Sequence, residues 1–189
     1  TDLNLIKHVA KKNKPIIIST GMANLNEISE AIDVCKNNGN SKIIILHCVS
    51  SYPALINQSN VSTILDLYKK FNLNIGLSDH TLSNTASCTS VAFGACLIEK
   101  HFTIDKRTKS PDNKFSLLPK DFKKLSIALN EAWQSIGRPN YKVLQSEKKN
   151  LIFRRSIYAI KDIKKNEIIT KEHVMVIRPG YGLPPKNLS

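Results

Sequence analysis

Four short apolar runs, each ending in polar residues and followed by a stretch with helical spacing, constrain the fold of this 189-residue chain most strongly. Continuous apolar runs of this length are typical of strands buried on both faces, as in parallel sheets. Because the runs alternate with helical stretches, the sequence predicts an α/β fold. The four predicted strands lie within residues 15–21, 42–48, 73–80 and 95–101.

Helices are predicted between these runs and after the last of them. Gly39 and Gly137 are expected to end the first and the last helix. A spacing of about 20–30 residues from strand to strand is typical of βαβ units. Four such units make up most of a small doubly wound sheet, or half of a (β/α)8 barrel, which needs about 250 residues when complete. The spacing of apolar residues predicts helices over 24–38, 61–71, 85–93 and 119–136.

The pattern changes after Pro139, where the chain becomes rich in short polar stretches. Short strands are expected at 156–160 and 167–169, around a turn rich in Lys, Asp and Asn. These strands indicate the beginning of a small β-rich second domain. We therefore expect a barrel part at residues 1–139, a linker at 140–152 and a partial second domain at 153–189.

Lysine and arginine outnumber the acidic residues and give the chain a net charge of +13. This charge favours either a nucleic-acid or anion binder or lysines spread over solvated faces. The lysines are scattered and are not interleaved with aromatic residues, as binding of single strands would require. We therefore expect no nucleic-acid partner.

The expected location is cytoplasmic. No apolar run approaches about 18 residues, and the first residues lack a signal-peptide pattern, so we expect no contact with a membrane. The cysteines form no C-x-x-C pair and are predicted to be reduced thiols. They are Cys35, Cys48, Cys88 and Cys96.

Two histidines follow consecutive predicted strands. Because side chains alternate along a strand, Ser78 and His80 share one face, and Glu99 and His101 share another. Active sites of parallel barrels gather at the carboxyl ends of the strands. Two imidazoles there can chelate one divalent cation and leave positions open for substrate and water. From spacing alone, the preferred interpretation is that each histidine has a structural hydrogen bond, and imidazole does not specify the metal.

Other polar residues near the strand ends are further candidates. Glu99 can carry a proton or bind a hydroxyl group, or it can form an ion pair with a lysine. The serines at the strand ends can hold a phosphate together with backbone N–H groups, or they can cap the following helices. His8 and His47 have no partner in the pattern and are predicted to be structural. The strand-end serines are Ser19, Ser50 and Ser78.

Four segments, in order and with matching spacing, resemble the sialic acid synthase family, which includes the N-acetylneuraminate, legionaminate and pseudaminate synthases. The resemblance implies a TIM barrel followed by an antifreeze-like (SAF) domain. It implies an enzyme that condenses phosphoenolpyruvate with an open-chain N-acetylated amino sugar and releases phosphate. The segments are 18–22, 46–54, 76–82 with Ser-Asp-His-Thr-Leu, and 99–103 with Glu-Lys-His-Phe-Thr.

The same resemblance implies a metal site and reverses the preference at the two histidines. His80 and His101 match the family's metal ligands, usually for Mn²⁺, with Mg²⁺ or Co²⁺ as alternatives. Together with Glu99 they form the expected catalytic set. The family's phosphoenolpyruvate-binding lysines and catalytic glutamate belong to the first four strands, which this chain does not match. We therefore expect the 189-residue chain to be inactive alone.

Five residues match substrate positions of the family. Ser19 and Ser78 match contacts of the phosphoenolpyruvate phosphate, and Ser50 lies at a position near the same substrate. Asp112 matches a position on the sugar. Arg178 resembles the SAF-domain arginine that reaches the sugar site of the other subunit, which implies a domain-swapped homodimer.

The sequences of two loops indicate which sugar is the substrate. Residues 50–54 and 112–117 are most similar to the pseudaminic branch, where Phe-Ser follows the loop aspartate. Pseudaminate is therefore favoured over N-acetylneuraminate or legionaminate. The alternative role for Phe115 is core packing alone. Ser110 occupies a loop position at which members of the family more usually have glycine. The second hypothesis is a non-catalytic fragment or binding protein, whose basic surface and antifreeze-like tail bind glycan or nucleic acid.

Overall fold

The computed structural model describes residues 2–107 and 109–188. The chain divides into two compact units, Thr1–Gly137 and Arg138–Ser189, which are described separately below. In the part of the chain that is described, no helix is both long enough and apolar enough to cross a membrane.

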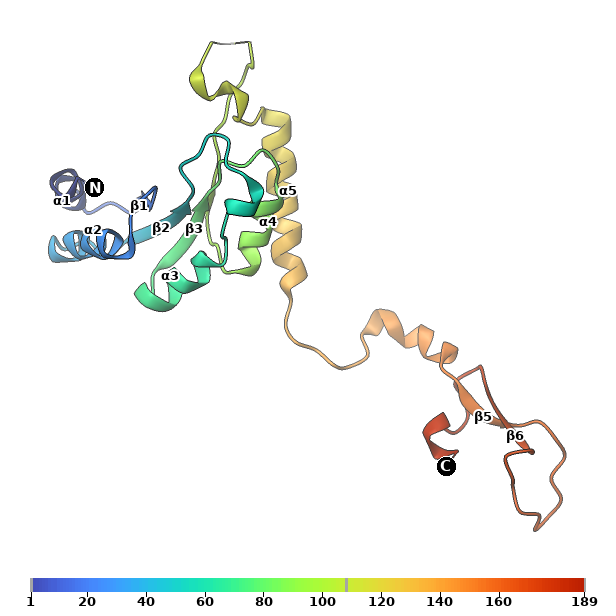
Figure 1. The fold of residues 1–189 in the computed structure, drawn as a ribbon. Helices are drawn as coiled ribbons and strands as arrows, with labels where there is room; N and C mark the ends of the chain where they lie inside the picture. Colours follow the sequence, from blue (N-terminus) through green and yellow to red (C-terminus); the bar gives the residue numbers. More distant parts are fainter. Residues whose placement is uncertain (1, 108, 189) are drawn as a thin grey trace. The chain divides into compact units, whose positions relative to one another are not determined.

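The first unit is built on a four-stranded parallel sheet with the order β1-β2-β3-β4 (Figure 1). Consecutive strands are neighbours and helices connect them, which is the arrangement of half a (β/α)8 barrel and confirms the predicted fold. The strands are β1 (Ile16–Ser19), β2 (Ile43–Cys48), β3 (Asn74–Ser78) and β4 (Ile98–Glu99). The helices are α2 (Leu25–Asn37), α3 (Thr63–Phe71), α4 (Thr85–Ala92) and α5 (Pro119–Ile136).

Local signals explain where these helices begin and end. Asn24 and Glu27 form a capping box at the start of α2, each side chain bonding the other residue's backbone N–H. Gly39 and Gly137 have positive φ angles of 80° and 53° and follow the helices that they were expected to end. One helix, α1 (Leu3–Ala10), was not predicted; the Asp2 side chain caps it.

The fourth strand is shorter than the predicted run at 95–101. Only Ile98–Glu99 is regular strand, although hydrogen bonds to β3 extend along the segment, from Cys96 N to the carbonyl of Ile75 and from Asp79 N to the carbonyl of Glu99. After β4 the chain turns into loops that contain η2 (Pro111–Lys114); η1 (Ile56–Gln58) lies in the loop after β2.

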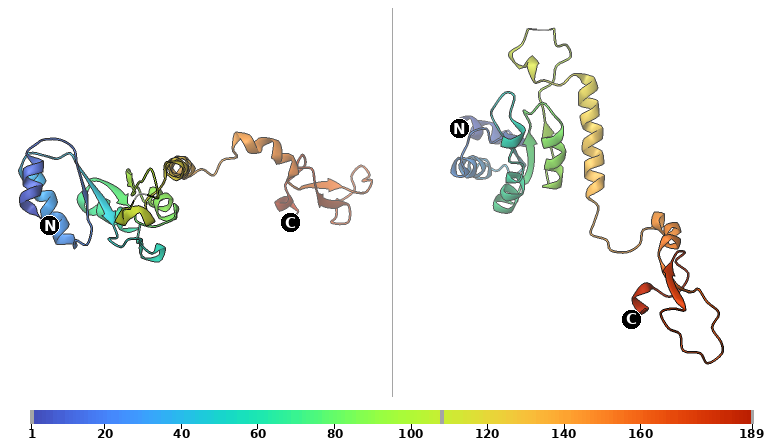
Figure 2. Two further views of the ribbon diagram at one scale, coloured as in Figure 1. Left: turned by 90° about the horizontal axis from the view of Figure 1, so that it is seen from above. Right: turned by 45° about the vertical axis from the view of Figure 1, so that its right-hand side comes forward.

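The two faces of the sheet have different roles. The side chains of Ile43, Ile45, Ile75 and Leu77 belong to the hydrophobic core that packs against the helices. Since side chains alternate along a strand, the residues between them point to the opposite face, where Gly76 and Ser78 lie. Helices α4 and α5 run side by side next to this sheet (Figure 2).

The second unit contains a two-stranded antiparallel sheet of β5 (Ser156–Ala159) and β6 (Val174–Ile177). The first strand was predicted, but the one expected at 167–169 is wrong. Asn166 has a left-handed backbone with φ of 69°, and Glu167 closes a turn with Lys164. The strand therefore begins only after this turn. The unit also contains η3 (Gln145–Phe153), which overlaps the expected linker, and η4 (Pro185–Asn187).

Candidate functional site

The two histidines singled out from the sequence lie side by side at the carboxyl ends of β3 and β4. His80 is two residues beyond β3 and His101 is two residues beyond β4. Their ring centroids are 5.2 Å apart. His80 is buried, whereas the side chain of His101 is 31% exposed. The parallel register, which pairs Ser78 with Glu99, brings the two rings together.

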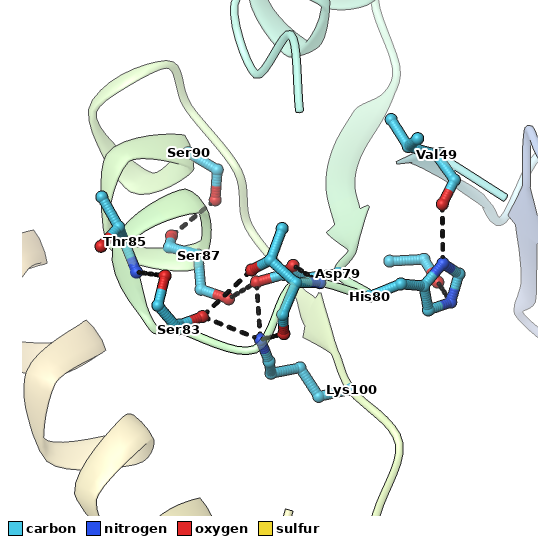
Figure 3. A network of polar contacts seen from close by, with 10 residues as sticks. Val49, Asp79, His80, Ser83, Thr85, Ser87, Ser90 and Lys100 are labelled. Atoms are coloured by element: carbon cyan, nitrogen blue, oxygen red, sulfur yellow. Dashed lines mark hydrogen bonds and ion pairs between the residues drawn. The ribbon is translucent and has the colours of Figure 1, made fainter. Parts of the chain in front are cut away.

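A backbone carbonyl fixes the orientation of the His80 ring. Its Nδ1 lies 2.9 Å from the carbonyl oxygen of Val49, in the loop after β2 (Figure 3). Because a carbonyl can only accept, Nδ1 carries the proton and donates it. The lone pair of the neutral ring therefore lies on Nε2. A hydrogen bond of this kind is what orients metal-binding imidazoles in proteins.

A carboxylate stands beside the second ring. The Nδ1 atom of His101 is 3.5 Å from Oδ2 of Asp112, which belongs to η2. A carboxylate next to one ring nitrogen leaves the other nitrogen available, as in carboxylate–histidine–metal arrangements. The structure thus places Asp112, expected at the sugar, directly beside a candidate metal ligand.

The donor set fits a divalent metal that keeps open positions. Bonds between zinc and imidazole nitrogen are about 2.1 Å long, so two rings with centroids 5.2 Å apart are close enough to share one ion. Among the described residues no group of three or more His, Cys, Asp or Glu side chains could hold a metal. The pair would therefore be a two-ligand site with room for substrate and water.

Ser78 and Glu99 form a hydrogen-bonded polar pair next to the histidines. Ser78 Oγ donates to Glu99 Oε1 at 2.7 Å, and it also lies 3.5 Å from His80 Nε2. The alternative expectation for Glu99 was an ion pair with a lysine. Its neighbour Lys100 instead pairs with Asp79, at 2.9 Å. Glu99 is thus exposed on the histidine side of the sheet, where it can accept or hold a proton.

The other candidate serines lie at strand ends but do not cap helices. Ser19 ends β1 and lines a hollow of about 400 Å³. Ser50 follows β2, and its Oγ lies 3.7 Å from Cys48 Sγ. The caps of α2 and α3 are Asn24 and Ser62. The capping interpretation of Ser19 and Ser50 is therefore wrong, and their role toward phosphate stays a prediction.

The remaining sequence candidates are placed as follows. His47 is buried, and its Nε2 lies 2.8 Å from the carbonyl of Ser59, which fits the structural role expected for it. His8 lies on helix α1, away from the paired histidines in sequence and in fold. Arg178 directly follows β6 in the second unit and is exposed. Its expected role in a sugar site stays a prediction.

Two aromatic rings lie beside the histidines, one from each of the two loops that the sequence linked to the choice of sugar. The ring of Tyr52 lies 4.3 Å from His80 and 5.7 Å from His101, measured between centroids. The ring of Phe115 lies 4.9 Å from His101 and 5.4 Å from Tyr52. Both residues come from loops, where side-chain periodicity gives no signal. They add an apolar wall to an otherwise polar site.

Within residues 2–107 and 109–188, three ionisable side chains have clearly shifted pKa values. The guanidinium of Arg107 and its backbone N–H lower the pKa of the Asp105 carboxyl, in the loop after β4. Burial raises the pKa of the Cys35 thiol in α2. Partial desolvation also raises the pKa of the Cys96 thiol, although this residue is exposed by surface area, against a smaller opposing backbone hydrogen bond. The cysteines are free thiols, as predicted.

The fold and the site define a class: half of a parallel (β/α)8 barrel with paired histidines at its strand ends, followed by a small β-rich unit. Comparison with known families assigns residues 1–141 to the NeuB family and residues 154–189 to the SAF domain. The chain therefore belongs to the NeuB family, which confirms the resemblance to sialic acid synthases.

Individual relatives agree with this assignment. The chain is 45% identical to the N,N'-diacetyllegionaminic acid synthase of Campylobacter jejuni, covering 97% of this chain and 56% of the relative. It is 42% identical to a pseudaminic acid synthase of the same species, covering 98% and 54%. The crystal structure of N-acetylneuraminic acid synthetase from Leptospira borgpetersenii superimposes with a TM-score of 0.71 at 32% identity, covering 79% and 52%. The chain thus spans about half the length of the curated relatives it matches.

Proposed function

We propose that the protein containing this chain is a metal-dependent nonulosonic acid synthase. It condenses phosphoenolpyruvate with an N-acetylated amino sugar and releases phosphate. The observation that carries the proposal is the pair of imidazoles at the ends of β3 and β4, with centroids 5.2 Å apart. Relatives named legionaminic and pseudaminic acid synthases, at 45% and 42% identity, support it.

His80 and His101 would hold the metal through their Nε2 atoms, since a carbonyl and a carboxylate lie at the two Nδ1 atoms. We propose Mn²⁺ as the ion, with Mg²⁺ or Co²⁺ as alternatives. When bound, such an ion supplies Lewis-acid polarisation of a carbonyl oxygen. Neutral imidazoles leave the charge of the ion uncancelled.

The proposed reaction forms one C–C bond and one C–O bond, and it breaks the C–O bond to phosphate. Carbon 3 of phosphoenolpyruvate attacks the aldehyde carbon of the open-chain sugar, and the aldehyde oxygen becomes a hydroxyl group by taking a proton. Water then adds at carbon 2 and releases a proton. The bond between carbon 2 and the phosphate oxygen breaks, so inorganic phosphate leaves and carbon 2 becomes a ketone carbonyl. Glu99, held by Ser78 at 2.7 Å, is positioned to hold a proton in this site. Fixing both substrates side by side lowers the entropic part of the barrier.

The substrates are assigned to the rest of the site. Ser19, Ser50 and Ser78 would contact phosphoenolpyruvate from the ends of three neighbouring strands. Asp112 would contact the sugar while it stands beside His101. Pseudaminate remains the proposed product, because Phe115 and Ser116 follow the loop aspartate Asp112, as in the pseudaminic branch of the family. Legionaminate and N-acetylneuraminate are the alternatives.

The assembly is also proposed. Arg178 of the SAF-domain sequence would reach the sugar site of a second subunit, in a domain-swapped homodimer. We propose a cytoplasmic location for this enzyme, since its cysteines are free thiols.

The test is phosphate release by the full-length protein from phosphoenolpyruvate, with Mn²⁺ and each candidate amino sugar in turn. We expect His80→Ala and His101→Ala each to lower the rate at least about 100-fold, because removing a ligand costs more than the 10–100-fold seen for outer partners. His8→Ala, the same change on helix α1, serves as the control and should leave the rate unchanged. Phosphate release that survives both site substitutions would show that the histidines hold no catalytic metal.

A further inference from the structure

A buried ion pair lies immediately beside the two histidines in sequence. Lys100 Nζ is 2.9 Å from Asp79 Oδ2, and the two side chains are only 2% and 1% exposed. Asp79 precedes His80, and Lys100 precedes His101. No role was expected for Asp79 or Lys100, although both lie within the predicted strands at 73–80 and 95–101.

Every polar group of the pair has a partner (Figure 3). Lys100 Nζ also donates to the carbonyls of Thr81 at 2.8 Å and Ser83 at 3.1 Å, which uses its three protons. The Asp79 carboxylate accepts from Thr81 N at 2.8 Å and from the Ser87 hydroxyl of helix α4. The network therefore ties the end of β4 to the loop after β3 and to α4.

The pair lies on the opposite face of the sheet from the histidines. Alternation along the strands points Asp79 and Lys100 toward α4, and His80 and His101 toward the other face. The backbone N–H of Asp79 bonds to the carbonyl of Glu99 at 2.9 Å, so the two strand ends are also joined by the main chain. Each anchored residue is thus the nearest backbone neighbour of one imidazole.

We propose that Asp79 and Lys100 are positioning residues that set the spacing of the two histidine rings, and that Ser87 holds Asp79 in place. This inference rests on the proposed metal site. A buried ion pair gives little net stability compared with apolar residues of similar size, so stability alone does not explain a fully bonded pair at this position. Holding two ligands at a fixed separation does explain it, because metal affinity depends on preorganised donors.

The decisive measurement is the affinity of the metal-free, full-length protein for Mn²⁺, followed by the EPR signal of free Mn²⁺, together with thermal melting. In the double variant Asp79→Leu/Lys100→Met we expect Mn²⁺ affinity to fall at least about tenfold, with a melting temperature near that of the wild type. The same substitutions in the exposed pair of α3, Asp66→Leu/Lys70→Met, are the matched control and should leave the affinity unchanged.

Ser87→Ala provides a second test in case the double variant does not fold. It removes one hydroxyl from the network, and we expect Mn²⁺ affinity to fall severalfold while the protein stays folded. A folded double variant, or a folded Ser87→Ala, with wild-type affinity would overturn the inference alone. Absence of Mn²⁺ binding by the wild type would overturn the metal site itself, and the inference with it.

Discussion

Successive residues at the strand ends point to opposite faces of the sheet and have different roles on each face. In β3, Ser78 and the following His80 point to the site, whereas Asp79 between them points to the helices and binds Lys100 and Ser87. The alternation of side chains therefore places the candidate catalytic residues on one face and the residues that hold the strand ends in place on the other.

Gly76 lies where strand β3 and the segment that leads into β4 approach each other closely. A Cβ atom at this position would lie 2.4 Å from the carbonyl oxygen of Leu97 and 2.6 Å from Leu46 Cδ2. We expect Gly76→Ala to lower the free energy of unfolding by about 1–3 kcal/mol, because a backbone atom must shift to relieve the overlap. Urea unfolding measures the effect, and wild-type stability would mean that β4 does not pack against β3 as described.

The paired histidines could be predicted from the sequence, but their partners could not. Spacing put His80 and His101 at the ends of consecutive strands, and family motifs were needed to prefer a metal over structural hydrogen bonds. The contacts of Val49, Tyr52 and Asp112 come from loops, where no period relates sequence to direction. Such contacts become visible only in the folded structure.

At the level of elements, boundaries were predictable where caps or glycines mark them. Helix α5 begins at Pro119 and ends at Ile136, as expected. Strand β4 was overestimated because an apolar run does not reveal where its regular pairing stops. Strand β6 was misplaced because the apolar pair Ile168 and Ile169 was assigned to a strand, whereas these side chains are 82% and 61% exposed and lie before β6.

Helix α2 offers a test of how well this layer of helices is packed. Cys35 is 0% exposed, and burial raises the pKa of its thiol above the usual 9.0. A raised folded-state pKa gives stability that is present below the unfolded pKa and is lost as the pH rises through the folded pKa. We therefore expect the free energy of unfolding to fall as the pH increases above about 9.

Urea unfolding between pH 8 and pH 10.5 measures this slope in the wild type and in Cys35→Ala. The variant should be less stable at pH 8 but should lose less stability on going to high pH. Cys88→Ala in helix α4, which is only partly buried, is the matched control. Equal slopes in wild type and Cys35→Ala would contradict the burial of this thiol.

At the scale of the whole molecule, the described sheet is open. Strands β1 and β4 each pair with a single neighbour within the described residues. Next to β4, a hollow of about 730 Å³ is lined by apolar side chains that include Phe122, Leu125 and Trp133. Unpaired strand edges and exposed apolar hollows favour the binding of another polypeptide segment. The expected inactivity of the 189-residue chain alone stays a prediction that fits this geometry.

The account depends above all on one ion bound by two imidazoles, which pulsed EPR of Mn²⁺ can count directly. In the full-length protein loaded with Mn²⁺ we predict nitrogen couplings from two histidines. His80→Ala and His101→Ala should each reduce these couplings to those of one nitrogen. A Mn²⁺ signal without nitrogen couplings, or couplings that both substitutions leave unchanged, would contradict the proposed centre.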